Sequence, residues 1–233
     1  MPGRAKNWAQ FLNENRIRTV AEIGVYKGMF AEKMLRNCPD IVTYYLVDPW
    51  RHLDNWNTPL NVHTDESFEE CYVEALRRTA PWEAKRVVLR GLTNEVIDTI
   101  PDASLDFAYI DGDHTLRGIT IDLMHVWPKV RPGGFIGGDD FCASVWQHEE
   151  NFEPTFVFPL AVYFAEAMDV PITALPRNQF VIERSNEGFS FRNDTGNYAS
   201  VTVSEALKRP PTPQPQTSAV QRLRRRLRQS VGV

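Results

Sequence analysis

The sequence predicts an α/β protein with a doubly wound, mostly parallel sheet that ends in an antiparallel hairpin. Five apolar runs alternate with segments of helical periodicity along the chain. These runs are apolar throughout, as is typical of parallel strands covered on both faces, and right-handed crossovers then give the doubly wound order. Residues 172–176 and 179–184 read as strands joined only by Arg177 and Asn178. So short a link forces an antiparallel hairpin.

The first four elements alternate between helix and strand. Three apolar side chains share one helical face within residues 4–16, which predicts a helix. Residues 18–26 contain a short apolar run that ends at a glycine, and residues 27–37 follow as a second helix with apolar positions four apart. Residues 41–50 form a second buried strand that a proline stops.

The alternation continues after a polar segment at residues 51–66. Residues 67–80 have the composition and spacing of a helix, and residues 85–91 are the third apolar strand. Residues 94–100 predict a short helix, and residues 105–113 are a fourth strand that runs into acidic residues. Parallel strands need such crossovers between them.

The last crossovers precede the hairpin. Apolar residues recur at helical spacing over 115–127, and the segment 130–141 is expected to be a turn followed by the fifth strand. Residues 159–168 predict a helix that opens at Pro159, because proline suits the first turn of a helix.

Composition divides the chain into a folded part and a tail. We expect one domain over residues 1–206, with an N-terminal helix in 1–18 and a candidate lid over the substrate at 51–64, for which an ordinary loop is the alternative. Residues 207–233 begin with a proline-rich linker that cannot build a core, and we expect them to be disordered. The segment Arg222–Arg228 holds five of the arginines, whereas the chain as a whole has a net charge of −4. This basic tail could contact nucleic acid, a membrane or an acidic partner, although a solvated terminus is the simpler interpretation.

Cysteine usage and the first residues predict a cytoplasmic protein. The three cysteines are an odd number without metal-type spacing, so we expect them to be reduced. The first residues lack the apolar core of a secretory signal, and no run has the roughly 18 apolar residues of a membrane span. Homo-oligomerisation stays open.

Each of the five parallel strands is followed by glycine or a polar side chain. Ligands of such sheets bind beyond the carboxyl ends of the strands, so these residues are the candidate site. Any one of them has a simpler explanation as a turn or a helix cap, but all five at one edge predict a ligand. The five strand ends are Glu22–Gly28, Asp48, Gly91–Thr93, Asp111–His114 and Asp139–Asp140.

The first two strand ends predict an adenosyl ligand. Glu22, Gly24 and Gly28 form the pattern E-x-G-x-x-x-G, whose glycines let a ligand approach the backbone. The fingerprint G-x-G-x-x-G is absent because Tyr26 takes the place of its second glycine, which argues against a pyrophosphate. Asp48 ends the second strand, where a carboxylate suits the hydroxyls of a ribose. A ribose without a pyrophosphate indicates a ligand such as S-adenosylmethionine.

At these segments, together with "DFAYIDGDH" and "VRPGG", the chain resembles class I S-adenosylmethionine-dependent methyltransferases over about residues 19–184. The resemblance implies a Rossmann-like methyltransferase sheet that ends in the same antiparallel hairpin. It also implies that Glu22 and Gly24 border the methionine part, that Asp48 holds the ribose and that Gly91 to Thr93 line the adenine. Gly28 and Asp111 are the other residues predicted to bind the cofactor.

A third feature is the acidic set at the ends of the fourth and fifth strands. Asp111, Asp139 and Asp140 would repel one another unless a cation joined them, and oxygen ligands favour Mg²⁺, with Mn²⁺ or Ca²⁺ as alternatives. The pattern is similar to that of metal-dependent O-methyltransferases of the catechol, caffeoyl-CoA and antibiotic-sugar types. That resemblance implies that the three aspartates bind the metal and that His114 is the general base; Asp113 has no counterpart role.

The predicted activity is S-adenosylmethionine-dependent, metal-assisted O-methylation of a small hydroxylated molecule. A substrate with two adjacent oxygens could chelate the cation, which favours a sugar or glycosylated metabolite, or a catechol. Simpler interpretations remain: His114 can be a helix-start histidine bonded to backbone, and Asp139–Asp140 a loop and cap pair. At the level of function, the alternatives are a nicotinamide-dependent oxidoreductase on a similar sheet and a non-catalytic scaffold that acts through its basic tail.

Overall fold

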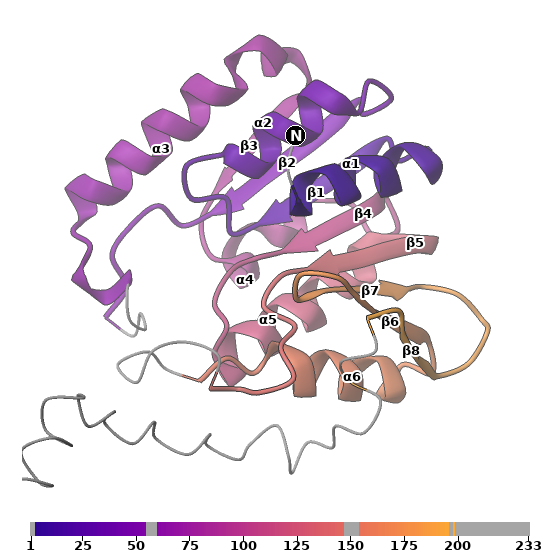
Figure 1. Cartoon of the computed structure of the whole chain (residues 1–233). Coiled ribbons are helices and arrows are strands. Elements are labelled where there is room, and N and C mark those ends of the chain that lie inside the picture. Colours follow the sequence, from indigo (N-terminus) through magenta and orange to yellow (C-terminus); the bar gives the residue numbers. More distant parts are fainter. Residues whose placement is uncertain (1–2, 55–59, 147–153, 196–197, 199–233) are drawn as a thin grey trace, which may run out of the picture.

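A single mixed sheet lies between two layers of helices in the computed structural model, which describes residues 3–54, 60–146, 154–195 and 198 (Figure 1). Its strand order is β3-β2-β1-β4-β5-β7-β6-β8. The strands are β1 Thr19–Ile23, β2 Thr43–Asp48, β3 Arg86–Arg90, β4 Leu105–Ile110, β5 Val130–Gly138, β6 Pro171–Leu175, β7 Gln179–Glu183 and β8 Ser190–Asn193. The α-helices are α1 Arg4–Glu14, α2 Met29–Asn37, α3 Asp65–Thr79, α4 Thr93–Val96, α5 Leu116–Val126 and α6 Val157–Ala167. The 3-10 helices are η1 Leu60–Val62, η2 Ala80–Lys85, η3 Ile97–Thr99 and η4 Trp127–Lys129.

The predicted fold class is confirmed. Strands β1 to β5 pair in parallel, and β7 pairs antiparallel with both β5 and β6. The chain order reverses between β1 and β4, which places the switch point of the sheet there. Helices α1, α2 and α3 cover one face, and α4, α5 and α6 cover the other (Figure 1).

Each face of the sheet has its own apolar core. Strand β4 supplies both: Phe107 and Tyr109 pack with Trp8 and the α1–α2 side, whereas Ala108 and Ile110 pack with the α5–α6 side. This alternation follows from the two-residue period of a strand. Burial on both faces fixes the register of the strand, because a slip of one residue would exchange the two faces.

Three details differ from the prediction. The segment 130–134 is the start of β5 rather than a turn, because the Gly133 N–H donates to the Arg184 carbonyl and the Arg184 N–H donates to Gly134. The register of β5 against β4 shifts at this point. Helix α6 begins at Val157, so Pro159 lies within its first turn, where no N–H donor is required. Strand β8, which pairs in parallel with β6, was not predicted.

Several predictions concern residues outside those described. They are the domain boundary near residue 206, the segment 207–233 and part of the candidate lid at 51–64. The three cysteines are free, as predicted, and the structure buries all of them. Among the described residues, no helix has the length and apolar character needed to cross a membrane.

Candidate active site

A crevice lies where the parallel strands end around the switch point. The backbone N–H groups of Gly24, Asp111 and Asp139 each donate to a carbonyl at or next to the end of a neighbouring strand, at 2.9, 2.8 and 3.1 Å. These bonds extend the sheet ladder by one residue and hold the loops after β1, β4 and β5 side by side. Four of the five predicted strand ends therefore meet with defined geometry, and the fifth joins them through the Gly91 N–H, which donates to Asp48 at 3.1 Å.

One side of the crevice is a pocket with about 690 Å³ of empty space, including its open mouth. Four of the residues predicted to bind the cofactor line it, namely Gly24, Asp48, Gly91 and Thr93. The remaining lining residues are Ile23, Val47, Pro49, Leu53, Leu92, Asn94, Gly112, Asp113, Arg117, Gly118, Ile121 and Asp122. The lining is mainly apolar with a few polar groups, as is usual for a small-molecule site.

Asp48 holds the end of β2 against the loop after β1. Its Oδ2 accepts hydrogen bonds from the N–H groups of Val25 and Tyr26 at 2.9 and 2.8 Å, and its Oδ1 accepts one from Trp50 at 2.8 Å. Burial raises the pKa of Asp48, and the three backbone N–H groups oppose that shift. The carboxyl is thus oriented before any ligand arrives, and it lines the pocket where the prediction puts a ribose.

Glu22 and Gly28 lie behind the pocket rather than in its lining. The Glu22 carboxyl is buried and accepts a hydrogen bond of 2.7 Å from the Tyr44 hydroxyl. Burial raises the pKa of Glu22 to about 8, against the lowering effect of that hydrogen bond. Gly28 is the N-cap of α2 at a φ of 71°, and a Cβ there would lie 2.9 Å from Ala75 of α3. Both residues shape the loop that borders the pocket.

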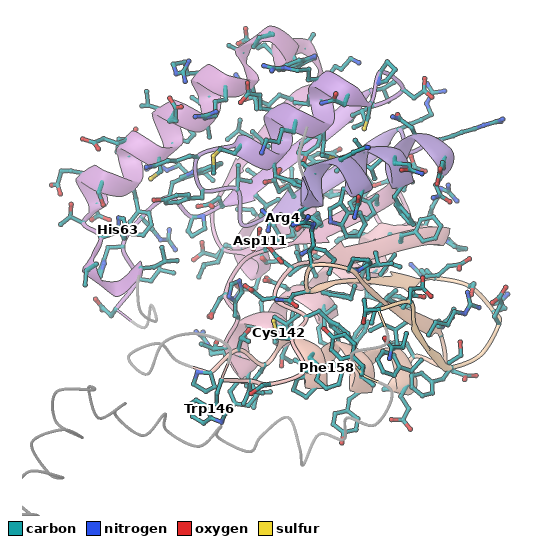
Figure 2. All side chains as sticks on the ribbon, in the orientation of Figure 1. Arg4, His63, Asp111, Cys142, Trp146 and Phe158 are labelled. Atoms are coloured by element: carbon teal, nitrogen blue, oxygen red, sulfur yellow. The ribbon has the colours of Figure 1, made fainter. Side chains whose placement is uncertain are left out.

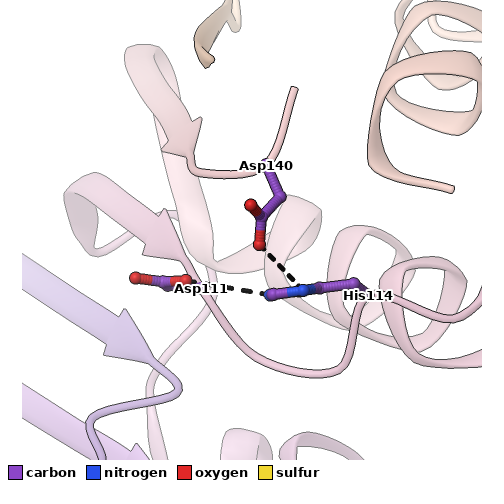
Figure 3. A group of neighbouring side chains, drawn as sticks. All are labelled: Asp111, His114 and Asp140. Atoms are coloured by element: carbon purple, nitrogen blue, oxygen red, sulfur yellow. Dashed lines mark ion pairs between the residues drawn. The ribbon is translucent and has the colours of Figure 1, made fainter. Parts of the chain in front are cut away.

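The other side of the crevice holds an acidic cluster, defined here as Asp111, His114 and Asp140 (Figure 3). One ligand atom from each lies within 4.8 Å of the others. The His114 Nδ1 is 2.8 Å from Asp140 Oδ2, and its Nε2 is 3.8 Å from Asp111 Oδ1. Burial lowers the pKa of His114, but the two carboxylates outweigh it and raise the pKa to about 10. The imidazole is therefore charged at neutral pH in this arrangement.

Asp139 faces a different set of groups. Its Oδ1 accepts hydrogen bonds from the Gln179 amide and from the Asp140 N–H, and its Oδ2 pairs with the Arg4 guanidinium. Arg4 also lies 3.4 Å from Asp111 Oδ2. Among the described residues, the structure thus brings Asp111 and Asp140 together with His114, whereas Asp139 is joined to them through Arg4.

The acidic cluster and the pocket share one loop. Gly112 and Asp113 line the pocket, while Asp111 and His114 belong to the cluster. The loop is held at its end by Asp113, whose Oδ1 accepts from the Thr115 N–H at 2.9 Å just before α5 begins. The four consecutive residues 111–114 therefore belong to both halves of the crevice, two to the pocket and two to the acidic cluster.

Three further residues of the crevice were not predicted. Arg4 and Gln179 reach Asp139 only through tertiary packing of α1 and β7, which no local pattern indicates. Asp122 lines the pocket and accepts a 2.6 Å hydrogen bond from Thr93. Burial raises its pKa to about 7, and the Thr93 hydrogen bond opposes this. The sequence contains a signal for Asp122: it lies three residues after Ile119, so it is a carboxylate on the apolar face of its helix.

Comparison with known proteins gives a family and several structural relatives. The family model described as a methyltransferase domain matches residues 21–141, slightly more than half of the chain. A putative caffeoyl-CoA O-methyltransferase from Staphylococcus aureus is 13% identical, with a TM-score of 0.57 over 78% of this chain and 84% of that one. An O-methyltransferase from Bacillus cereus, solved in complex with SAH, is 18% identical, with a TM-score of 0.57 over 78% and 80%. The O-methyltransferase TomG from Streptomyces achromogenes, solved with SAM, is 16% identical, with a TM-score of 0.53 over 77% and 78%. At these identities the three structures share the fold, and no curated protein sequence matches the chain.

Proposed function

Because this chain belongs to the methyltransferase-domain family, we propose that it is an S-adenosylmethionine-dependent O-methyltransferase that acts with a divalent cation on a small hydroxylated molecule. The family favours this function over the nicotinamide-dependent oxidoreductase that the fold class alone leaves open. The observation that carries the proposal is the shared loop of residues 111–114, with a ligand pocket on one side and two carboxylates and an imidazole on the other. A methyl donor and a hydroxyl acceptor would meet across this loop.

The cofactor half of the proposal rests on the pocket. S-adenosylmethionine, when bound, supplies an electrophilic methyl group on a sulfonium. Asp48, already oriented by three backbone N–H groups, is proposed to accept hydrogen bonds from the ribose. Gly91 and Thr93 also line the pocket and are proposed to contact the adenine, with Gly24 close to the methionine part. Glu22 and Gly28 would support this wall from behind.

The metal half of the proposal rests on the chemistry of the donor set. Carboxylate oxygens suit Mg²⁺, with Mn²⁺ or Ca²⁺ as alternatives. Asp111 and Asp140 are close enough to share one ion, with His114 beside them as the proposed base, and Asp139 is bonded to the Asp140 N–H. A divalent cation, when bound, lowers the pKa of a coordinated hydroxyl. Oriented carboxylates would also hold the acceptor oxygen in line with the methyl group.

His114 is the proposed general base, and its surroundings set a condition on that role. Asp111 and Asp140 stabilise the imidazolium, so His114 in the described arrangement cannot accept a proton at neutral pH. Asp111 and Asp140 would hold the divalent cation, and with their charge directed to it they would stabilise the imidazolium less, so that neutral His114 could accept the proton of the acceptor hydroxyl. A substrate with two adjacent oxygens, such as a sugar or glycosylated metabolite, fits this arrangement best.

Calorimetry and a methyl-transfer assay test the proposal. We expect the purified protein to bind S-adenosylhomocysteine and not NAD, and to methylate a member of a panel of sugars, glycosides and catechols in the presence of Mg²⁺. EDTA and the variant His114→Gln should each reduce turnover by about 100-fold or more. The matched control His125→Gln changes an exposed histidine of α5 and should leave turnover unchanged. NAD binding without S-adenosylhomocysteine binding would refute the function, whereas activity indifferent to EDTA and to His114→Gln would refute only the metal and base roles.

A further inference from the structure

The N-terminal helix places a fixed positive charge in the acidic half of the crevice. Arg4, in the first turn of α1, pairs with Asp139 and lies 3.4 Å from Asp111. Figure 2 labels Arg4 and Asp111, which lie next to each other in that view. The Arg4 side chain is 37% exposed, while the Asp139 and Asp111 side chains are 16% and 24% exposed, so both ion pairs are partly shielded from water. Charged hydrogen bonds of this kind, partly shielded from water, are among the strong ones in proteins.

Charge balance explains why the arginine is there. Asp111, Asp139 and Asp140 bring three carboxylates to neighbouring strand ends, and such a group repels itself unless cations join it. In the described structure the Arg4 guanidinium supplies a fixed positive charge next to Asp139 and Asp111, while the His114 imidazole contacts Asp140. Two of these carboxylates, Asp111 and Asp139, contact Arg4 and are also proposed ligands of the divalent cation, so a bound cation would lie close to the Arg4 charge.

We infer that Arg4 is a tethered competitor of the divalent cation, and that cation binding releases Arg4 from Asp111 and Asp139. The inference rests on the proposed function only in taking these aspartates as cation ligands. A divalent cation bound by Asp111 and Asp139 would lie close to the Arg4 guanidinium, and the two positive charges would repel one another in this partly buried place. Cation binding would therefore weaken the arginine pair, and the apparent affinity for the cation would be lower by the free energy needed to displace Arg4.

The release has a structural consequence in α1. No side chain caps this helix, and its first turn is held by the Gly3 carbonyl, which accepts from the N–H groups of Lys6 and Asn7 at 3.1 and 3.4 Å. Loss of the Arg4 pair removes a polar anchor from this turn, whereas Trp8, fully buried with its Nε1 bonded to Gln179, keeps the rest of the helix in place. Cation binding should thus loosen the start of α1 without detaching the helix.

Mn²⁺ binding to the full-length protein, measured by calorimetry, tests the inference without requiring a substrate. We expect Arg4→Gln to bind Mn²⁺ about tenfold or more tightly than the unmodified protein, because the competing charge is gone. Arg4→Lys, which keeps a positive charge, should bind less tightly than Arg4→Gln. The control Lys6→Gln removes a positive charge from an exposed position on the same helix and should change the affinity less than twofold. Equal or weaker binding by Arg4→Gln would overturn the inference.

Hydrogen exchange gives a second readout that does not depend on affinity. Saturating Mg²⁺ should accelerate exchange of the Lys6 and Asn7 amides in the unmodified protein, and should have no such effect in Arg4→Gln. Unchanged exchange in both proteins would overturn the inference. S-adenosylhomocysteine binding separates the two proposals: a protein that binds it but binds no Mn²⁺ in either form refutes the inference and the metal role together while leaving the methyltransferase function standing.

Discussion

Gly24→Ala should damage the crevice far more than a methyl group usually does. Gly24 has a φ of 86°, in the left-handed region, and a Cβ there would lie 2.2 Å from the Asp111 carbonyl oxygen and 2.7 Å from the Gly112 Cα. Both atoms belong to backbone, so no side chain can rotate away. The loop of residues 111–114, which separates the pocket from the acidic cluster, would have to move.

The expected cost has two parts. The positive φ alone costs an alanine about 1 kcal/mol. Moving packed backbone to remove the overlap costs about 1–3 kcal/mol more. Together they predict a loss of about 2–4 kcal/mol in the free energy of unfolding. Because Gly24 and Gly112 both line the pocket, we also expect S-adenosylhomocysteine to bind at least tenfold more weakly.

Gly188→Ala is the matched control for the cost of the positive φ. Gly188 has a φ of 80°, close to that of Gly24, but a Cβ there would find its nearest neighbour, Asp169, at 3.7 Å. In this variant the free energy of unfolding should fall by only about 1 kcal/mol, and the affinity for S-adenosylhomocysteine should not change. Urea unfolding of both variants, with calorimetry on the folded proteins, measures the difference. If Gly24→Ala is no less stable than Gly188→Ala and binds the ligand normally, the close approach of the two loops is refuted.

Two further predictions concern buried polar groups. Burial raises the pKa of Glu22 to about 8, above the 4.5 of an ordinary glutamate, so the folded state holds this proton more tightly and stability falls as the pH rises between these values. Glu22→Gln should therefore gain stability relative to the unmodified protein by up to about 1 kcal/mol per pH unit from pH 5 to pH 8 in urea unfolding, and a pH-independent difference would contradict this. Gln179→Leu should lose about 2–4 kcal/mol, because the Trp8 Nε1–H and Tyr109 hydroxyl both donate to the Gln179 Oε1 and would be left unpaired. Gln10→Leu, which removes only an exposed hydrogen bond, should stay within about 0.5 kcal/mol; similar losses for the two variants would argue against the network.

Local patterns were sufficient to predict the sheet, because its signals are local. Continuous apolar strands, helical spacing and the two-residue link at Arg177 and Asn178 each act within a few residues. Strand β8 was missed since Ser190–Asn193 is short and half-exposed, and it exists only because β6 offers a free edge. The start of α6 was predicted at Pro159 instead of Val157, because proline fits several positions in the first turn of a helix.

The site residues at the ends of the strands could be predicted from the sequence, but the side chains that contact them could not. Residues such as Asp48 and Asp111 are located by topology alone, because parallel strands end at one edge of the sheet. The direction in which each carboxyl points depends on its neighbours, and Asp139 differs from Asp140 for this reason. Arg4 and Gln179 come from the two ends of the fold, and no spacing in the chain relates either of them to Asp139.

The loop of residues 111–114 borders both proposed ligand sites. Gly112 and Asp113 line the pocket, and their neighbours Asp111 and His114 belong to the acidic cluster. A change in this loop on binding at one site would therefore reach the other site, and any coupling free energy between donor and ion would be equal in both directions. Donor and ion would bind with positive cooperativity if both favour the same arrangement of the loop, and with negative cooperativity if they favour different ones.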